Sequence, residues 1–140
     1  MEKINFVNKP NTTTPINDKN LNKMQENIEK EFDGVILYQS DNGSNEKITF
    51  ENQLLIPPKR IKIYYKDEDD THSFTEIDNP LEKPIDLHIL RINRSYNLRM
   101  KYSRVLLTLT GIDISDYGRN DNGGLSAKND IYITKIIAYI

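Results

Sequence analysis

Between residues 34 and 140, hydrophobic and polar residues alternate in short segments that are separated by turn residues. A period of two residues is typical of a β-strand with one buried and one exposed face. The clearest apolar faces consist of Ile61, Ile63 and Tyr65 in one segment and of Ile85, Leu87 and Ile89 in another. About eight such strands are expected, so the pattern predicts a mainly β fold, an antiparallel β-sandwich or jelly roll.

Other segments carry the same alternation. Ile48 and Phe50 share one face of a predicted strand, and segment 131–140 is predicted to be the last strand. Segment 96–102 is predicted to place its apolar residues on one face and its polar residues on the other, with Tyr96, Leu98, Met100 and Tyr102 opposite Asn97, Arg99 and Lys101. The next segment, 105–114, is predicted to bury Val105, Leu107 and Leu109.

The pattern before residue 34 is different. Residues 5–16 are expected to form an extended arm, because residues that precede proline and β-branched threonines both disfavour the helical conformation. Asn17 then suits a helix N-cap, and Leu21, Met24 and Ile28 recur at intervals of three and four residues. This spacing predicts one short α-helix that ends near Gly34.

We therefore divide the chain into an N-terminal arm with an oligomerisation helix, residues 1–33, and a β-sandwich domain, residues 34–140. A helix of about 15 residues is marginal by itself in water, so its apolar stripe needs a partner. That partner is either the body of its own chain or the same helix from other subunits. The spacing of Leu21, Met24 and Ile28 matches a coiled coil but lasts less than two heptads, so contacts between β domains must contribute to any oligomer.

The composition argues against several classes of function. Nineteen Lys and Arg and 21 Asp and Glu give a formal net charge of −2 and are interspersed, so no face that binds nucleic acid is expected. The chain contains no cysteine, which excludes disulfides and thiolate chemistry. The first residues do not resemble a signal peptide, and no apolar run approaches about 20 residues. Synthesis in the cytoplasm, without membrane insertion, is therefore expected.

Candidate metal and catalytic residues are few. His72 and His88 lack the spacing of a metal or catalytic motif. The acidic run 67–70 lacks the pattern of a calcium loop and is expected to be a hairpin tip that its charge keeps solvated. The sequence contains no nucleophile elbow and no phosphate-binding glycine loop before a helix. We therefore predict no catalytic residue, no metal ligand and no cofactor.

A polar segment from Ser115 to Asp130 is predicted to be a long loop. Sugar-binding sites commonly combine an aromatic face for the ring with amide, carboxylate or guanidinium groups for the hydroxyls. Within five residues this segment contains all of these groups, and its candidate glycan-binding residues are Tyr117, Arg119, Asn120 and Asp121. An ordinary hairpin loop built from turn residues is the alternative interpretation.

Three stretches carry a resemblance to a known class of protein. The first, "INFVNKPNTTTPINDKNLNKMQENI", resembles the N-terminal segment of tail and baseplate structural proteins, of the receptor-binding type, from phages of low-GC Gram-positive bacteria. The closing "IYITKIIAYI" looks like the last strand of the small β domains that follow such a segment. The middle, "GVILYQSDNGSNEKITF" and "IKIYYKD", is similar to the first hairpins of the same domains.

The resemblance implies a virion component at the tail tip or baseplate, a homo-oligomer with a trimer favoured. It implies other tail and baseplate proteins as partners, and host cell-surface glycan as a candidate ligand. It does not imply an enzyme. Two other hypotheses stay open: a monomeric carbohydrate-binding module whose helix packs on its own sandwich, and a glycan hydrolase with a pair of carboxylates.

Overall fold

A computed structural model of the protein describes residues 34–92, 98–121 and 123–140. The predicted arm and helix, with the proposed oligomerisation residues Leu21, Met24 and Ile28, lie outside the described residues. The described residues form nine strands and no helix. The strands are β1 (Val35–Ser44), β2 (Ile48–Thr49), β3 (Arg60–Lys66), β4 (His72–Asp78), β5 (Pro84–Ile92), β6 (Leu98–Leu107), β7 (Gly111–Asp121), β8 (Gly124–Ser126) and β9 (Tyr132–Tyr139).

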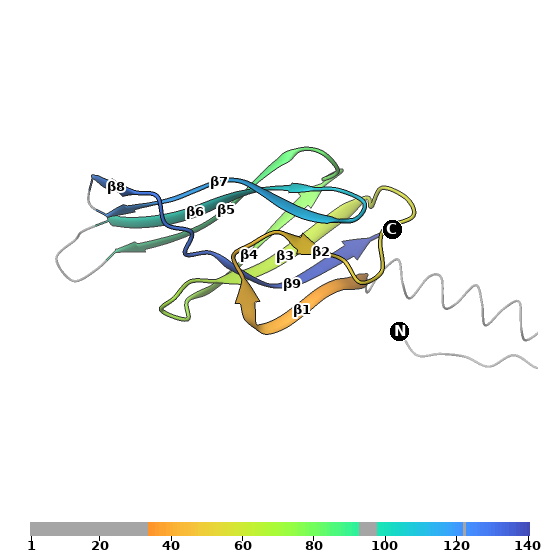
Figure 1. The fold of residues 1–140 in the computed structure, drawn as a ribbon, viewed down its shortest axis with the longest axis horizontal. Coiled ribbons are helices and arrows are strands. Elements are labelled where there is room, and N and C mark those ends of the chain that lie inside the picture. The colour runs from red at the N-terminus through yellow and green to blue at the C-terminus, as the bar shows by residue number, and fades with distance from the viewer. Residues whose placement is uncertain (1–33, 93–97, 122) are drawn as a thin grey trace, which may run out of the picture.

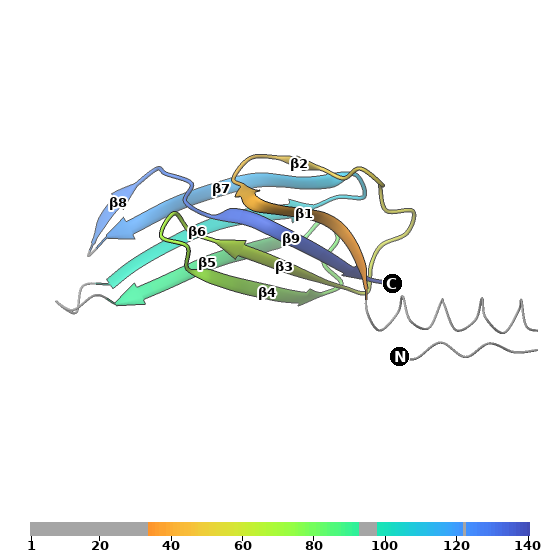
Figure 2. The same cartoon turned by 90° about the horizontal axis from the view of Figure 1, so that it is seen from below.

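The strands form two sheets. One sheet has the order β1-β9-β3-β4, and the other has the order β2-β7-β6-β5 with β8 added beside β7. Every strand pairing that joins these elements is antiparallel. Figure 1 shows β5 to β8 along one side of the molecule and β1, β3 and β9 along the other, and Figure 2 gives the perpendicular view. The predicted mainly β, antiparallel sandwich is therefore confirmed.

The core lies between the two sheets and contains the predicted triplets. The apolar residues of β3 and of β5 that alternate in the sequence are all buried: Ile61, Ile63, Tyr65, Ile85, Leu87 and Ile89. The predicted shared face of Ile48 and Phe50 is buried as well. Burying such a side chain contributes roughly 1.5–3 kcal/mol relative to leaving it exposed, so these faces fix which side of each strand points inward.

The prediction that the apolar residues of segment 96–102 form the buried face of a strand is wrong. In β6 the side chain of Lys101 is buried, whereas Leu98 and Met100 are exposed on the outer face of the sheet. The start of the second predicted segment, residues 105–107, continues β6, whereas residues 111–114 begin β7. Val105 and Leu107 fall on the same face of β6 as Lys101. A strand can bury only one set of alternate residues, and the set with Val105 and Leu107 is buried. Tyr96 lies outside the described residues, and Leu109, also predicted to be buried, is exposed.

The predicted loop from Ser115 to Asp130 is also wrong. Its first half is the end of β7, which pairs with β6 from Arg99↔Asp121 to Arg104↔Asp116 before the register shifts. The second half contains the short strand β8. All four candidate glycan-binding residues therefore lie on a strand, where Tyr117, Arg119 and Asp121 share one face and Asn120 points to the other.

The two ends of the sandwich differ. Gly34, which begins the described part, and the C-terminal Ile140 lie at one end (Figures 1 and 2). The opposite end gathers the β3–β4 turn, the outer ends of β5, β6 and β7, and the segment that leads from β8 into β9. Charged residues collect at this second end.

Candidate functional site

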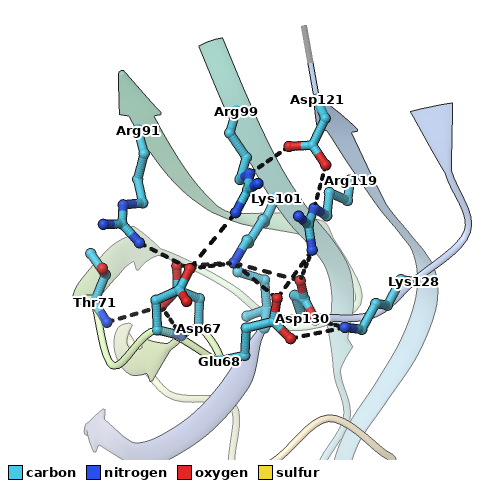
Figure 3. Close-up of polar contacts among 12 residues, drawn as sticks. Asp67, Glu68, Thr71, Arg91, Arg99, Lys101, Arg119, Asp121, Lys128 and Asp130 are labelled. Carbon is cyan, nitrogen blue, oxygen red and sulfur yellow. Dashed lines mark hydrogen bonds and ion pairs between the residues drawn. The ribbon is translucent and has the colours of Figure 1, made fainter. Parts of the chain in front are cut away.

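Ten charged side chains from five parts of the chain meet at the second end of the sandwich (Figure 3). We call this group the ion cluster. It comprises five carboxylates and five cations: Asp67, Glu68, Asp69, Asp121 and Asp130, with Arg91, Arg99, Lys101, Arg119 and Lys128. Strands β5, β6 and β7 supply four of the cations, and the turn after β3 supplies three of the carboxylates.

Lys101 is the centre of the ion cluster. Its side chain points from β6 into the sandwich and is 0% exposed. The ammonium nitrogen lies 3.2 Å from a carboxylate oxygen of Asp67, 3.4 Å from Asp69 and 3.5 Å from Asp130. Asp67 and Asp130 are themselves buried. A buried ammonium is tolerated only where anions and hydrogen bonds replace its water, and these three carboxylates do so.

The β3–β4 turn places Asp67 in this position. One oxygen of the Asp67 carboxylate accepts hydrogen bonds from the backbone N–H groups of Asp69 (3.0 Å) and Thr71 (2.9 Å), which closes the turn on itself. Its other oxygen faces Lys101. Burial by itself would raise the pKa of Asp67, but the Thr71 N–H and the Lys101 ammonium outweigh it, and the pKa lies below its usual range. The predicted solvated hairpin tip is thus wrong for this residue.

Arg119 connects the remaining carboxylates. Its guanidinium donates to Asp121 at 2.7 Å, to Glu68 at 3.0 Å and to Asp130 at 3.2 Å. Asp121 also accepts a hydrogen bond from Arg99, its cross-strand partner. Desolvation would raise the pKa of Asp121, but the two guanidinium groups hold it below its usual range. These charge-assisted bonds tie β6 and β7 to the β3–β4 turn.

Lys128 completes the ion cluster from the segment before β9. Its ammonium lies 2.8 Å from Glu68 and 3.3 Å from one oxygen of Asp130. That Asp130 oxygen accepts no hydrogen bond within the described residues, although it is buried. The Lys128 ammonium at 3.3 Å neutralises its charge without the geometry of a hydrogen bond, so the oxygen is ion-paired rather than isolated.

The arrangement can stabilise the fold, but it does not resemble a reactive centre. Each carboxylate faces a cation of the same chain, and the counts of the two signs are equal. An acid–base pair of carboxylates needs two groups whose environments shift their pKa values apart. In the ion cluster the pKa values of Asp67, Glu68 and Asp121 are all lowered. Among the described residues, no group of His, Asp and Glu side chains has the arrangement of a metal site.

The four predicted glycan-binding residues are divided between the two faces of β7. Arg119 and Asp121 are engaged in the ion cluster. Asn120 lies opposite Met100 and Leu125 on the outer face of its sheet. Tyr117 lines an open hollow of about 580 Å³ together with Tyr132 and Lys128, among others. The structure therefore places Tyr117 in a hollow that borders the ion cluster at Lys128, whereas Asn120 lies on the opposite face of β7.

An apolar groove occupies the other end of the sandwich. It has a volume of about 460 Å³ and is lined by the start of β1, by residues 51–56 and by the C-terminal residue. Several of its side chains are exposed, with Leu55 at 87%, Ile36 at 54% and Ile56 at 53%. The groove begins at Val35, one residue after the first described position, so it lies beside the start of the described sandwich.

Sequence reasoning missed the buried charges. Lys101 lies an even number of residues before Val105 and Leu107, so a single strand places all three side chains on the same face. This spacing was the signal in the sequence that Lys101 points inward. Asp67 and Asp130 give no such signal, because a turn residue is exposed or buried according to what packs over it. Their burial follows from the approach of β6 and β7 to the turn.

No protein family, curated protein or solved structure matches the chain. In the part of the chain that the structure describes, no helix has the length and apolar character needed to cross a membrane.

Proposed function

We propose that the protein is a structural component of a phage tail tip or baseplate that assembles into a homo-oligomer, with a trimer favoured. The N-terminal sequence resemblance supports the place in the virion. The proposal that copies of the chain assemble rests on the apolar groove at the start of β1. An exposed apolar surface of this kind on a protein domain commonly marks an interaction site.

The groove fits what the sequence demands of an oligomer. A helix stripe of less than two heptads cannot hold copies together alone, so the β domains must supply further contact. Leu55, Ile36 and Ile56 provide exposed apolar area at the end of the domain that the helix segment joins. Helix and groove would then contribute to one continuous interface between copies.

A non-enzymatic role agrees with the ion cluster. Its carboxylates are neutralised by cations of the same chain, which favours a rigid end of the domain over an acid–base pair that acts on a substrate. We therefore place host recognition, with glycan as the candidate ligand, on the open faces of the sandwich. A hydrolase is the weaker alternative, because glycoside hydrolysis needs two carboxylates with separate roles.

Light scattering of the full chain tests the assembly. Leu21→Asp, Ile28→Asp and Leu55→Asp should each lower the solution mass toward that of one chain, because each places a charge in a desolvated interface. Asn22→Asp is the matched control, since it adds the same charge to the predicted helix at a position that points away from the apolar stripe. A wild-type chain with the mass of a monomer would overturn the proposal and leave the monomeric carbohydrate-binding module.

A further inference from the structure

The outer face of the β1-β9-β3-β4 sheet carries aromatic rings and lysines in register. Phe74, Tyr64, Lys135 and Gln39 form one row, since each lies directly opposite the next on β4, β3, β9 and β1. The neighbouring row runs through Glu76, Lys62, Ile137 and Ile36. The four strands lie side by side in Figure 2. We call Phe74, Tyr64, Lys62 and Lys135 the aromatic–lysine face.

The rings and the ammonium groups of this face are in contact. The centroids of Tyr64 and Phe74 are 5.9 Å apart, with the ring planes inclined at 44°. The Lys62 nitrogen lies 4.4 Å from the Phe74 centroid and 5.0 Å from that of Tyr64, and the Lys135 nitrogen lies 6.0 Å from the Tyr64 centroid. Phe74 is 54% exposed, so its ring stays open to a ligand.

The two lysines differ from the cations of the ion cluster. Among the described residues, neither the Lys62 nor the Lys135 ammonium forms an ion pair with a carboxylate, whereas Lys66 on the same strand lies 3.5 Å from Asp70. The rings hold the two ammonium groups in place, and Glu76, opposite Lys62, attracts the Lys62 charge without forming a close ion pair. An incoming anion would therefore meet ammonium groups with hydrogen-bonding capacity to spare.

Polar groups suited to hydroxyls adjoin the face. A shallow hollow of about 260 Å³ is lined by Tyr64 and Lys135 together with polar residues that include Gln39, Ser73, His72 and one carboxylate, Asp41. Amide, hydroxyl and imidazole groups can donate and accept hydrogen bonds, which is what a sugar ring with several hydroxyls requires. Rings, unpaired lysines and the polar hollow thus lie on one continuous surface.

We propose that the aromatic–lysine face binds an anionic glycan. The apolar side of a sugar ring packs on Phe74 and Tyr64, its phosphate or carboxylate group binds Lys62 and Lys135, and its hydroxyls bind in the hollow. This inference rests on the proposed host recognition, for which it names the site and the ligand class. Nucleic acid fits less well, because it carries a phosphate at every nucleotide, whereas this face offers two lysine ammonium groups and is bordered by Glu76 and Asp78.

Calorimetric titration of the full chain tests the ligand class. The probes are dextran phosphate, polygalacturonate, neutral dextran and a poly-dT oligonucleotide. At least one of the two charged glycans should bind about ten-fold or more tightly than neutral dextran and should weaken as salt is added. The tighter of the two identifies phosphate or carboxylate as the anion. Equal binding of neutral dextran, tighter binding of poly-dT, or no binding of either charged glycan would overturn the proposal.

Substitutions test whether the glycan binds at the aromatic–lysine face. The double variant Lys62→Gln with Lys135→Gln should weaken charged-glycan binding about ten-fold or more, and Phe74→Ala should weaken all glycan binding. Lys66→Gln is the matched control, because it removes one charge from the same strand where the lysine is already paired. Tyr117→Ala should leave binding unchanged, and loss of binding there but not at Lys62 and Lys135 would overturn the assignment.

The same samples separate this inference from the proposed function. Thermal unfolding of each variant shows that the fold is retained, and light scattering gives the oligomeric state. An oligomer that binds no charged glycan contradicts only the inference. A monomer whose glycan binding depends on Lys62 and Lys135 contradicts only the proposed assembly.

Discussion

The ammonium of Lys101 lies 3.2 Å from the carboxylate of Asp67, and both side chains are buried. Lys101 belongs to β6 of one sheet, and Asp67 directly follows β3 of the other. Their contact therefore joins the two sheets at one end, where the core contains charge rather than hydrocarbon. Such a pair is sensitive to the loss of one partner, because the other is then left buried without compensation.

Replacing Lys101 by methionine should destabilise the protein by about 3–5 kcal/mol. The substitution keeps the length of the side chain but leaves Asp67 facing no cation within the ion cluster. Urea denaturation followed by circular dichroism measures the change in the free energy of unfolding. The control is Arg104→Met, which breaks the exposed ion pair with Asp86 and should cost about 1 kcal/mol or less.

A double variant tests whether the Lys101→Met cost arises from the unpaired Asp67. Adding Asp67→Asn to Lys101→Met removes the stranded charge, so the double variant should lose less stability than the sum of the two single variants. Additive losses would show that the cost of Lys101→Met arises from the contacts of Lys101 with Asp69 and Asp130 and not from its pair with Asp67.

Stability should fall in acid through the carboxylates of the ion cluster. The pKa values of Asp67, Glu68 and Asp121 all lie below their ordinary range because of neighbouring lysine, arginine and backbone N–H groups. A depressed carboxylate pKa contributes stability that is fully present above the unfolded value, near 4, and is lost as the pH falls through the folded value. Unfolding free energies measured from about pH 6 downward should therefore decline below about pH 4.

Asp67→Asn identifies one of the groups responsible for that decline. The variant has one fewer proton to bind on unfolding in acid, so its stability should decline less steeply, by up to about 1.4 kcal/mol per pH unit. An unchanged slope would mean that Asp67 does not contribute to the acid sensitivity.

The orientation of β6 predicts that the same substitution, leucine to alanine, costs very different amounts of stability at two positions of the strand. Leu107→Ala should cost about 2–5 kcal/mol, because Leu107 is fully buried and its loss opens a cavity in the core. Leu98→Ala, on the outward face of the same strand and 48% exposed, should cost about 0.5 kcal/mol or less. Thermal or urea unfolding compares the two. Equal costs would contradict the assigned orientation of the strand.

Gly111→Ala should destabilise the β2–β7 pairing by about 1–3 kcal/mol. Gly111 lies opposite Thr49, and a Cβ atom there would collide with the backbone of Ile48, which cannot rotate away. Gly124→Ala is the control, because the nearest atom to its added Cβ is a carbonyl oxygen at 3.3 Å. Differential scanning calorimetry should show a lower midpoint for the first variant than for the second.

The alternation of apolar and other residues was sufficient to predict which faces of β3 and β5 are buried. The residues that alternate with the apolar triplets of these two strands are Lys62, Tyr64, Asp86 and His88. Only one facing therefore buries most of the apolar area of each strand. The same reasoning failed in β6, where Leu98 and Met100 and then Val105 and Leu107 form apolar sets on opposite faces. Pattern alone cannot choose between two apolar faces.

The strand at 115–121 was mistaken for a loop for a related reason. Its inward side chains include Arg119 and Asp121, which face the ion cluster instead of an apolar core. Strand prediction relies on apolar residues at alternate positions, so a strand that packs against charges has no such signal. The pairing with β6 reveals it.

By itself, the sequence determined the class of fold, the two largest apolar faces and the absence of cysteine chemistry, because these depend on composition and on a period of two residues. The tertiary structure decided which face of β6 points inward, that Asp67, Lys101 and Asp130 are buried together, and that Lys62 and Lys135 flank Tyr64 across β3 and β9. These features join residues far apart in the chain, and their energies depend on desolvation and charge pairing that arise only when the two sheets pack.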